Sequence, residues 1–147
     1  MASEDDAQKL KTVHRIQTAM AFGYSGMGAW CLLQPSSVIG LSLNPPYALV
    51  NRTTSLLMSC FGAQAMTCGL LLGTADMSQK SFTIFGLAMI PYVAFNFWFG
   101  LGPGRDVFTP LLWLDFVGNM VFGLGSLHCG RLLGKIGQSQ EAKRSKD

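Results

Sequence analysis

Four apolar stretches, each about as long as a lipid bilayer is thick, occupy most of this 147-residue chain. They run over residues 16–33, 54–72, 82–101 and 111–133. An α-helix rises ~1.5 Å per residue, so about 20 apolar residues cross a hydrocarbon core of ~30 Å. Asp115 is the only charged residue well inside any of the four stretches. The sequence therefore predicts an all-α, multi-pass membrane protein whose four transmembrane helices form an antiparallel bundle.

The composition excludes most classes of soluble enzyme. The chain is 49% hydrophobic and 13% charged, whereas soluble domains carry about 25% charged residues. Its net charge of +3 forms no basic stripe with interleaved aromatic residues, so we expect no nucleic-acid partner. The four cysteines lie in apolar stretches without a CxxC motif. They are expected to be reduced packing residues, and we expect neither a metal site nor a cofactor.

The distribution of basic residues predicts the orientation in the membrane. Arg52 and Arg105 are the only basic residues in the two connections assigned to one side; all other Lys and Arg lie on the side of the termini. Cytoplasmic segments are enriched in Lys and Arg, so both termini are expected in the cytoplasm. The predicted organisation is a cytoplasmic segment (1–15), a transmembrane domain (16–133) and a basic cytoplasmic tail (134–147). From Gly137 onward we expect the tail to be disordered.

Prolines and connection lengths predict how the helices are joined. Pro35 should end the first span, and Pro91 should kink the third. The apolar connection that follows the first span is expected to lie on the membrane surface. The connections at 74–81 and 102–109 are short, so spans two and three, and spans three and four, should be antiparallel neighbours.

Small residues recur at helical spacing on three of the spans, where they allow helix backbones to approach closely. Such a face is predicted for span two, for span one and, with polar residues included, for span four. The residues are Ser55, Ser59, Gly62, Met66, Gly69 and Gly73; Ala19, Gly23 and Gly26; and Asp115, Asn119, Phe122, Ser126 and Gly130.

Asp115 is the principal candidate for a functional residue, because carboxylates inside membrane spans are costly to insert. Counting residues from Pro110 places it in the outer half of the bundle, at a depth similar to that of Asn96. Asn119 follows one helical turn later, and Arg52 begins span two on the same side. The predicted cluster is either an ion pair of Arg52 with Asp115 that fixes the helices, which we favour, or a ligand site.

Several other polar residues are secondary to this cluster. Tyr24, Trp30 and Gln34 of the first span lie toward the same side, and Gln64 lies on a polar face of span two. His128 is on a different face of span four from Asp115 and is expected to be a hydrogen-bonded bundle residue. We identify no catalytic residue. Asn51 matches the glycosylation pattern, but it adjoins a span, so we treat the match as incidental.

The first two spans carry a family resemblance. Leu33-Gln34-Pro35, Gly40, Arg52, Phe61-Gly62 and Gly69 give a pattern that resembles small four-helix membrane proteins of the DoxX-like kind, and more loosely the ergosterol-biosynthesis scaffold family. The resemblance covers roughly residues 33 to 73. It implies a four-helix bundle and transfers no catalytic residue.

Three functions remain open at this point. The first is a non-enzymatic protein that binds membrane lipids, a membrane-protein partner or a second copy of itself. The second is a small transporter or channel in which Asp115 binds an ion or a proton. The third, a lipid-modifying enzyme, has only Asp115, Asn96, Asn119 and His128 to work with. We rank them in that order.

Overall fold

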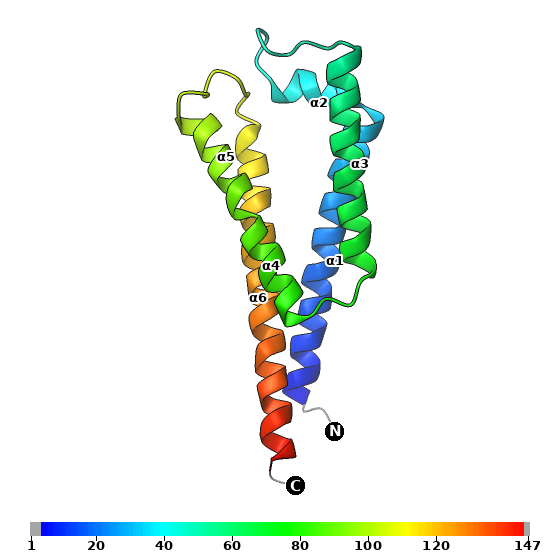
Figure 1. Cartoon of the computed structure of the whole chain (residues 1–147), viewed down its shortest axis with the longest axis vertical. Helices are drawn as coiled ribbons and strands as arrows, with labels where there is room; N and C mark the ends of the chain where they lie inside the picture. The colour runs from blue at the N-terminus through cyan, green and yellow to red at the C-terminus, as the bar shows by residue number, and fades with distance from the viewer. Residues whose placement is uncertain (1–3, 146–147) are drawn as a thin grey trace.

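The computed structural model describes residues 4–145, which form six α-helices and no strand (Figure 1). The prediction of an all-α chain is confirmed. Both ends of the described chain lie at the same end of the molecule (Figure 1). The helices are α1 (Glu4–Leu33), α2 (Pro35–Ser42), α3 (Arg52–Thr74), α4 (Gln79–Ala88), α5 (Ile90–Leu101) and α6 (Leu112–Arg144).

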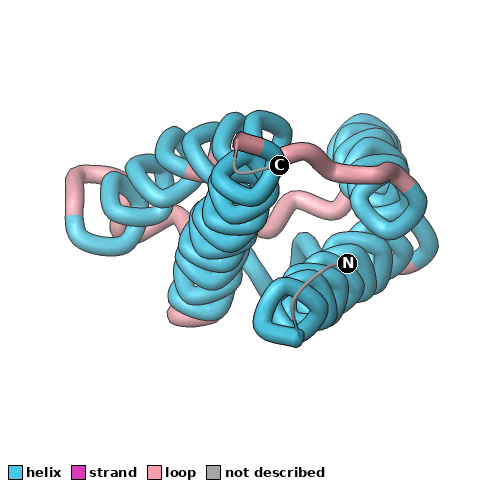
Figure 2. Tube along the Cα trace, turned by 90° about the horizontal axis from the view of Figure 1, so that it is seen from below, coloured by secondary structure: helices cyan, strands magenta, loops and turns pink. Residues whose placement is uncertain are grey.

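The long helices are arranged as two antiparallel pairs (Figures 1 and 2). In one pair α1 packs along α3, and in the other α4 and α5 pack along α6. The pairs meet through α1 and α6 at the end that carries the termini, and they diverge toward the opposite end, which we call the loop end. The expectation that spans two and three pack together is wrong, because α3 packs on α1 instead. A short connection requires only that two helix ends lie near each other.

Backbone contact holds α1 against α3. A Cβ atom added to Gly28 would lie 2.3 Å from the Met66 backbone nitrogen, and one added to Gly62 would lie 2.4 Å from that of Leu32. A Cβ on Gly69 would lie 2.4 Å from the Ser25 hydroxyl oxygen. The predicted packing face of span two is therefore confirmed, since only glycine permits this approach.

The packing face predicted for span one is only partly correct. Gly23 does pack, but against Phe122 of α6, and no atom lies within 4 Å of a Cβ built on Gly26. Gly28, Ser25 and Ala21 form the side of α1 that contacts α3.

Local sequence explains the helix ends. Pro35 and Pro91 each stand in the first turn of a helix, where a proline's missing N–H is not needed. The predicted kink at Pro91 appears as a break at Met89 between α4 and α5. Asn51 caps α3: its side chain accepts a hydrogen bond from the Thr54 N–H (2.9 Å), and the Thr54 hydroxyl accepts one from the Asn51 N–H (3.0 Å).

Helix extends further at both ends of the chain than the four apolar stretches suggest. α1 begins at Glu4, and α6 continues to Arg144, so the expected disorder of the tail is wrong for its described residues. The tail is rich in Gln, Glu, Ala, Lys and Arg, all strong helix formers. Buried Ile136 also anchors this part of α6.

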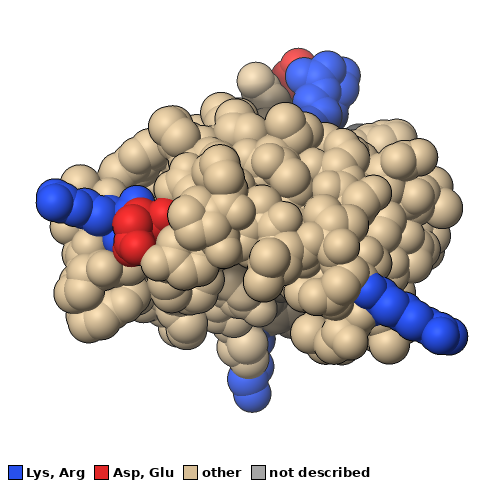
Figure 3. Space-filling model, turned by 90° about the horizontal axis from the view of Figure 1, so that it is seen from above, with Lys and Arg blue, Asp and Glu red and all other residues tan. Residues whose placement is uncertain are grey.

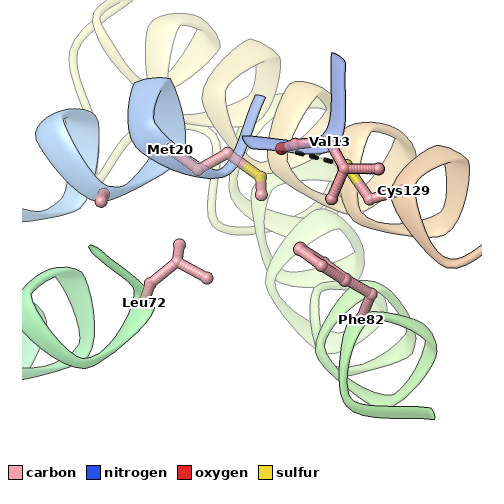
Figure 4. Packing of buried hydrophobic residues seen from close by; sticks show 6 residues of the cluster. Val13, Met20, Leu72, Phe82 and Cys129 are labelled. Atoms are coloured by element: carbon pink, nitrogen blue, oxygen red, sulfur yellow. Dashed lines mark hydrogen bonds between the residues drawn. The ribbon is translucent and has the colours of Figure 1, made fainter. Parts of the chain in front are cut away.

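The hydrophobic core lies at the terminal end, where the pairs meet. Figure 4 shows Val13 and Met20 of α1, Leu72 of α3, Phe82 of α4 and Cys129 of α6 converging there. Nearby, the Gln17 amide donates hydrogen bonds to the carbonyls of Leu72 (2.7 Å) and Ala75 (2.9 Å), and so satisfies the last turn of α3.

Two segments of the described chain are long and apolar enough to cross a membrane. They are Arg52–Thr74 (α3) and Gln79–Leu101 (α4 with α5), each of 23 residues. Only 17% of the most apolar window of each is buried, unlike the core helix of a soluble protein. α1 and α6 exceed this length, but small and polar residues interrupt their apolar stretches.

The seam between α1 and α3 predicts a sharp contrast between two glycines one half-turn apart. Gly28→Ala should destabilise the protein by about 1–3 kcal/mol, because the added methyl group collides with backbone that cannot move independently. Gly26→Ala, with open space around its Cβ, is the matched control and should be neutral or slightly stabilising. Thermal unfolding in detergent micelles measures both. Equal melting temperatures for the two variants would contradict the seam.

Candidate functional site: a polar cluster between the two helix pairs

Three of the four residues predicted to cluster do come together. The Asn96 side-chain amide of α5 donates a hydrogen bond to Asp115 Oδ2 (2.8 Å) and a longer one to the Leu112 carbonyl (3.3 Å). The Asn119 amide donates to the same Asp115 oxygen (3.1 Å). Asp115 also stands in the first turn of α6, where the helix dipole favours negative charge. The polar cluster is hereafter Asn96, Asp115 and Asn119.

The cluster is buried on one side and open on the other. Asn96 is 1% exposed and Asn119 is 9% exposed, whereas Asp115 is exposed. Asn96 Oδ1 is buried and has no hydrogen-bond partner among the described residues. A buried acceptor without a partner costs about 1–3 kcal/mol. The cluster therefore has an unused acceptor next to an accessible carboxylate.

Arg52 is not part of this cluster. It begins α3 and is exposed, and among the described residues Asp115 forms no ion pair with Lys, Arg or His. The arrangement of the pairs explains why: α3 packs against α1, and α5 and α6 form the other pair. The predicted ion pair of Arg52 with Asp115 is wrong. Matching depth along two helices does not make their residues neighbours.

Asp115 lies on the face of α6 that points toward α1. Asp115, Asn119, Phe122 and Ser126 follow at steps of four, three and four, which places them on one side of the helix. Farther toward the terminal end this face contacts α1: Phe122 stacks on Tyr24, and the Ser126 hydroxyl lies 3.5 Å from Met20 Sδ. Because the pairs diverge toward the loop end, Asp115 and Asn119 are on the part of the face that turns into the space between them.

Tyr24 joins α1 to the second pair on the terminal side of the cluster. Its ring stacks on Phe122 with centroids 4.6 Å apart and meets Phe85 edge-on at 5.9 Å. Its hydroxyl donates to Met89 Sδ (3.1 Å). Residues of α4, of α6 and of the break at Met89 therefore surround this phenol.

Sequence reasoning named Tyr24 only as a neighbour of the site. The signal that points to a larger role is a phenol in the middle of an apolar span, because a buried tyrosine hydroxyl needs a partner. The other residues named with it lie elsewhere: Trp30 is 41% exposed, and Gln34 is the exposed residue between α1 and α2.

The two secondary candidates are not in the polar cluster. Gln64 is exposed on α3, one helical turn toward the loop end from Cys68, and has no hydrogen-bond partner among the described residues. His128 is exposed on α6, two residues beyond Ser126 and therefore on the opposite side of the helix from α1. The predicted separation of His128 from Asp115 is confirmed, but the expectation of a hydrogen-bonded bundle residue is wrong, because the His128 side chain is exposed and forms no hydrogen bond among the described residues. The cysteines are all free, Cys31 and Cys129 buried and Cys60 and Cys68 exposed.

The loop end of the space is bridged by the chain itself. Residues 41–44, which end α2, pair with residues 106–109, which precede α6, and we call this pairing the loop bridge. The Asn44 N–H donates to the Val107 carbonyl (2.9 Å), and the Thr109 N–H donates to the Ser42 carbonyl (2.9 Å). Phe95 and Phe99 of α5 pack on Phe108 from below. The loop bridge joins the two pairs at the end where the helices themselves are apart.

One hydrogen bond beside the loop bridge depends on pH. The Tyr47 hydroxyl donates to Asp106 Oδ2, which lowers the pKa of Asp106 and raises that of Tyr47. Because the pKa of Asp106 is lowered in the folded protein, ionised Asp106 stabilises the fold at pH values above the ordinary carboxyl pKa. This contribution is lost as the pH falls through the lowered pKa. The pKa of Tyr47 is raised, so its neutral form stabilises the fold at lower pH, and this contribution is lost as the pH rises through the raised pKa. This bond therefore persists throughout the neutral range.

Comparison with known proteins adds no assignment. No family model matches the chain, and neither a curated protein nor a solved structure is significantly similar to it. The function has to be argued from the geometry alone.

The hydrogen bonds of the cluster predict which residues are energetically coupled. In a double-mutant cycle, Asn96→Ala and Asp115→Ala should show an interaction free energy of about 0.5–3 kcal/mol, because each removes the other's partner. Arg52→Gln and Asp115→Ala should be additive to within about 0.5 kcal/mol. Unfolding of the wild type, the three single variants and the two double variants in detergent measures both cycles. Coupling of Asp115 to Arg52, but not to Asn96, would restore the ion pair and contradict the cluster.

Proposed function

We propose that this chain is an integral membrane protein with four membrane-crossing segments, and that it binds a lipid-like ligand between its two helix pairs without modifying it. The observation that carries the proposal is the polar cluster: an accessible carboxylate and a buried, unused amide oxygen on helices whose outward side chains are apolar. The crossing segments are α1, α3, α4 with α5, and α6.

The outward surface of all four segments supports membrane insertion. Large apolar side chains are exposed on α1 and α6 as well as on the two segments that are long and apolar enough to cross a membrane, α3 and α4 with α5. On α1, Phe22 is 75% exposed, and on α6, Leu114 is 68% exposed. Such surface is unfavourable in water but has the character of a lipid-facing helix. Because α1 runs antiparallel to α3, and α6 runs antiparallel to α4 and α5 (Figure 1), each pair would cross together.

The charge distribution supports an orientation with both termini in the cytoplasm. Seen from the loop end, the surface is mostly uncharged (Figure 3). The terminal end carries the remaining basic residues, including Lys9 and Lys11 of α1 and Lys135 of α6. This asymmetry follows the positive-inside pattern.

The surroundings of the cluster favour a ligand that arrives from the lipid. The core closes the space at the terminal end, and the loop bridge spans it at the other. The remaining approach is sideways, between helices whose outer faces are apolar. A molecule taking this route needs a hydrocarbon body and a polar end that can reach Asp115.

The orientation predicts opposite accessibility of the two ends of the molecule. In a background without native cysteines, Ser145→Cys should react with a membrane-impermeant maleimide only from the cytoplasmic side. Ser36→Cys, exposed in α2, should react only from the other side. Labelling of intact and permeabilised cells measures this. Reaction of both positions from the same side would refute four crossings.

Ligand binding predicts where a photoactivatable lipid attaches. With the full chain in nanodiscs, an amphiphile carrying a diazirine near its polar end should label residues around the space, such as Tyr24 and Phe122. An excess of unlabelled amphiphile should suppress this labelling. Labelling of Phe22 and Leu114, which face outward, should not saturate, and these positions serve as the internal control. Mass spectrometry of peptides reads out both sets.

Two results would overturn the ligand proposal. One is labelling that follows exposure alone and never saturates at Tyr24 or Phe122. The other is crosslinking of the same positions to a second copy of the chain or to another protein, which would make the space a docking site for a partner helix.

A further inference from the structure

The polar cluster contains hydrogen-bond acceptors and negative charge, but no cation. Both donors, the amides of Asn96 and Asn119, are directed at a single oxygen, Asp115 Oδ2. The other carboxylate oxygen has no hydrogen-bond partner among the described residues, and neither has Asn96 Oδ1. Asn96 Oδ1 is buried, so the free oxygen of the exposed Asp115 carboxylate is the acceptor left for something outside the chain.

Because the surroundings of the cluster are apolar, a cation supplied by a ligand would interact strongly with Asp115. The electrostatic interaction between a carboxylate and a cation is several times stronger in a low-dielectric medium than in water. Charged residues inside a membrane are generally paired, and Asp115 has no charged partner among the described residues. A ligand that brings a positive charge would gain most at this position.

The aromatic residues beside the cluster also favour a cation. Phe122 lies one turn from Asn119, stacked on Tyr24 with ring centroids 4.6 Å apart. The faces of aromatic rings attract ammonium groups. A hydroxyl end group would supply one donor and no charge, whereas a primary or secondary ammonium supplies at least two donors and the charge.

We infer that the ligand is an amphiphile whose polar end is a primary or secondary ammonium group. The ammonium binds Asp115 and donates to its free carboxylate oxygen, and the hydrocarbon tail lies against the apolar side chains of the two helix pairs. This inference rests on the proposed function, in which a lipid-like molecule binds between the pairs. The carboxylate selects the charge, and its free oxygen selects N–H donors over a quaternary ammonium.

The test compares amphiphiles that differ only in their polar end. Octadecylamine, octadecanol and octadecanoic acid compete with the photoactivatable amphiphile for labelling of Tyr24 and Phe122 in nanodiscs near neutral pH. The amine should compete at least tenfold more effectively than the alcohol, and the acid should compete least. Octadecyltrimethylammonium should be weaker than the primary amine, because it has no N–H to donate.

Two variants connect this preference to Asp115. Asp115→Asn should reduce competition by the amine at least tenfold, so that amine and alcohol become similar. Asp76→Asn removes an acidic group from the exposed connection between α3 and α4 and is the matched control; it should keep the wild-type preference. Circular dichroism establishes that both variants are folded.

The outcomes distinguish a failure of this inference from a failure of the proposed function. If the alcohol competes as well as the amine in the wild-type protein, the site binds a lipid-like molecule but does not select an ammonium, and the inference is refuted. If no amphiphile suppresses labelling at Tyr24 and Phe122, the proposed function fails as well. The wild-type ranking decides between these outcomes even if Asp115→Asn does not fold.

Discussion

At Gly28 and Gly62 the backbones of α1 and α3 touch, and the position of the remaining helices follows from this contact. It occupies the small-residue face of α3, so α3 has no comparable surface left for α4. The second pair must therefore be held by α1, which offers Met20 to Ser126 and Gly23 to Phe122. Beyond Tyr24, α1 and α6 are no longer in contact through large side chains, and the pairs diverge.

The divergence gives the polar cluster its properties. Had the seam of α1 and α6 continued, Asp115 would be buried against α1 and would need a cation of the chain to compensate it. Instead its carboxylate is exposed, and it is held in place from its own pair by Asn96 and Asn119. In the proposed function, this carboxylate, oriented by amides and left without a counterion, is available to a ligand.

Sequence patterns predicted the features of the fold that depend on a single helix. The glycine spacing of span two, the break near Pro91 and the shared depth of Asn96, Asp115 and Asn119 all follow from helical geometry or proline chemistry. The errors concern relations between helices. Arg52 has the expected depth but belongs to the other pair, and Gly26 has the expected composition but points into open space. Rotation about a helix axis and choice of partner depend on packing across the whole bundle.

The loop bridge and the core bear on the choice between binding and transport. A transporter that uses Asp115 must expose it alternately to the two sides of the membrane. Here hydrogen bonds from Asn44 and Thr109 join the pairs on one side of it, and the buried side chains of Val13, Leu72 and Phe82 close the pairs on the other. Opening the first would break several backbone hydrogen bonds, and opening the second would separate the core. Because the sideways approach requires neither change, the arrangement favours exchange of a ligand with the surrounding lipid over passage across it.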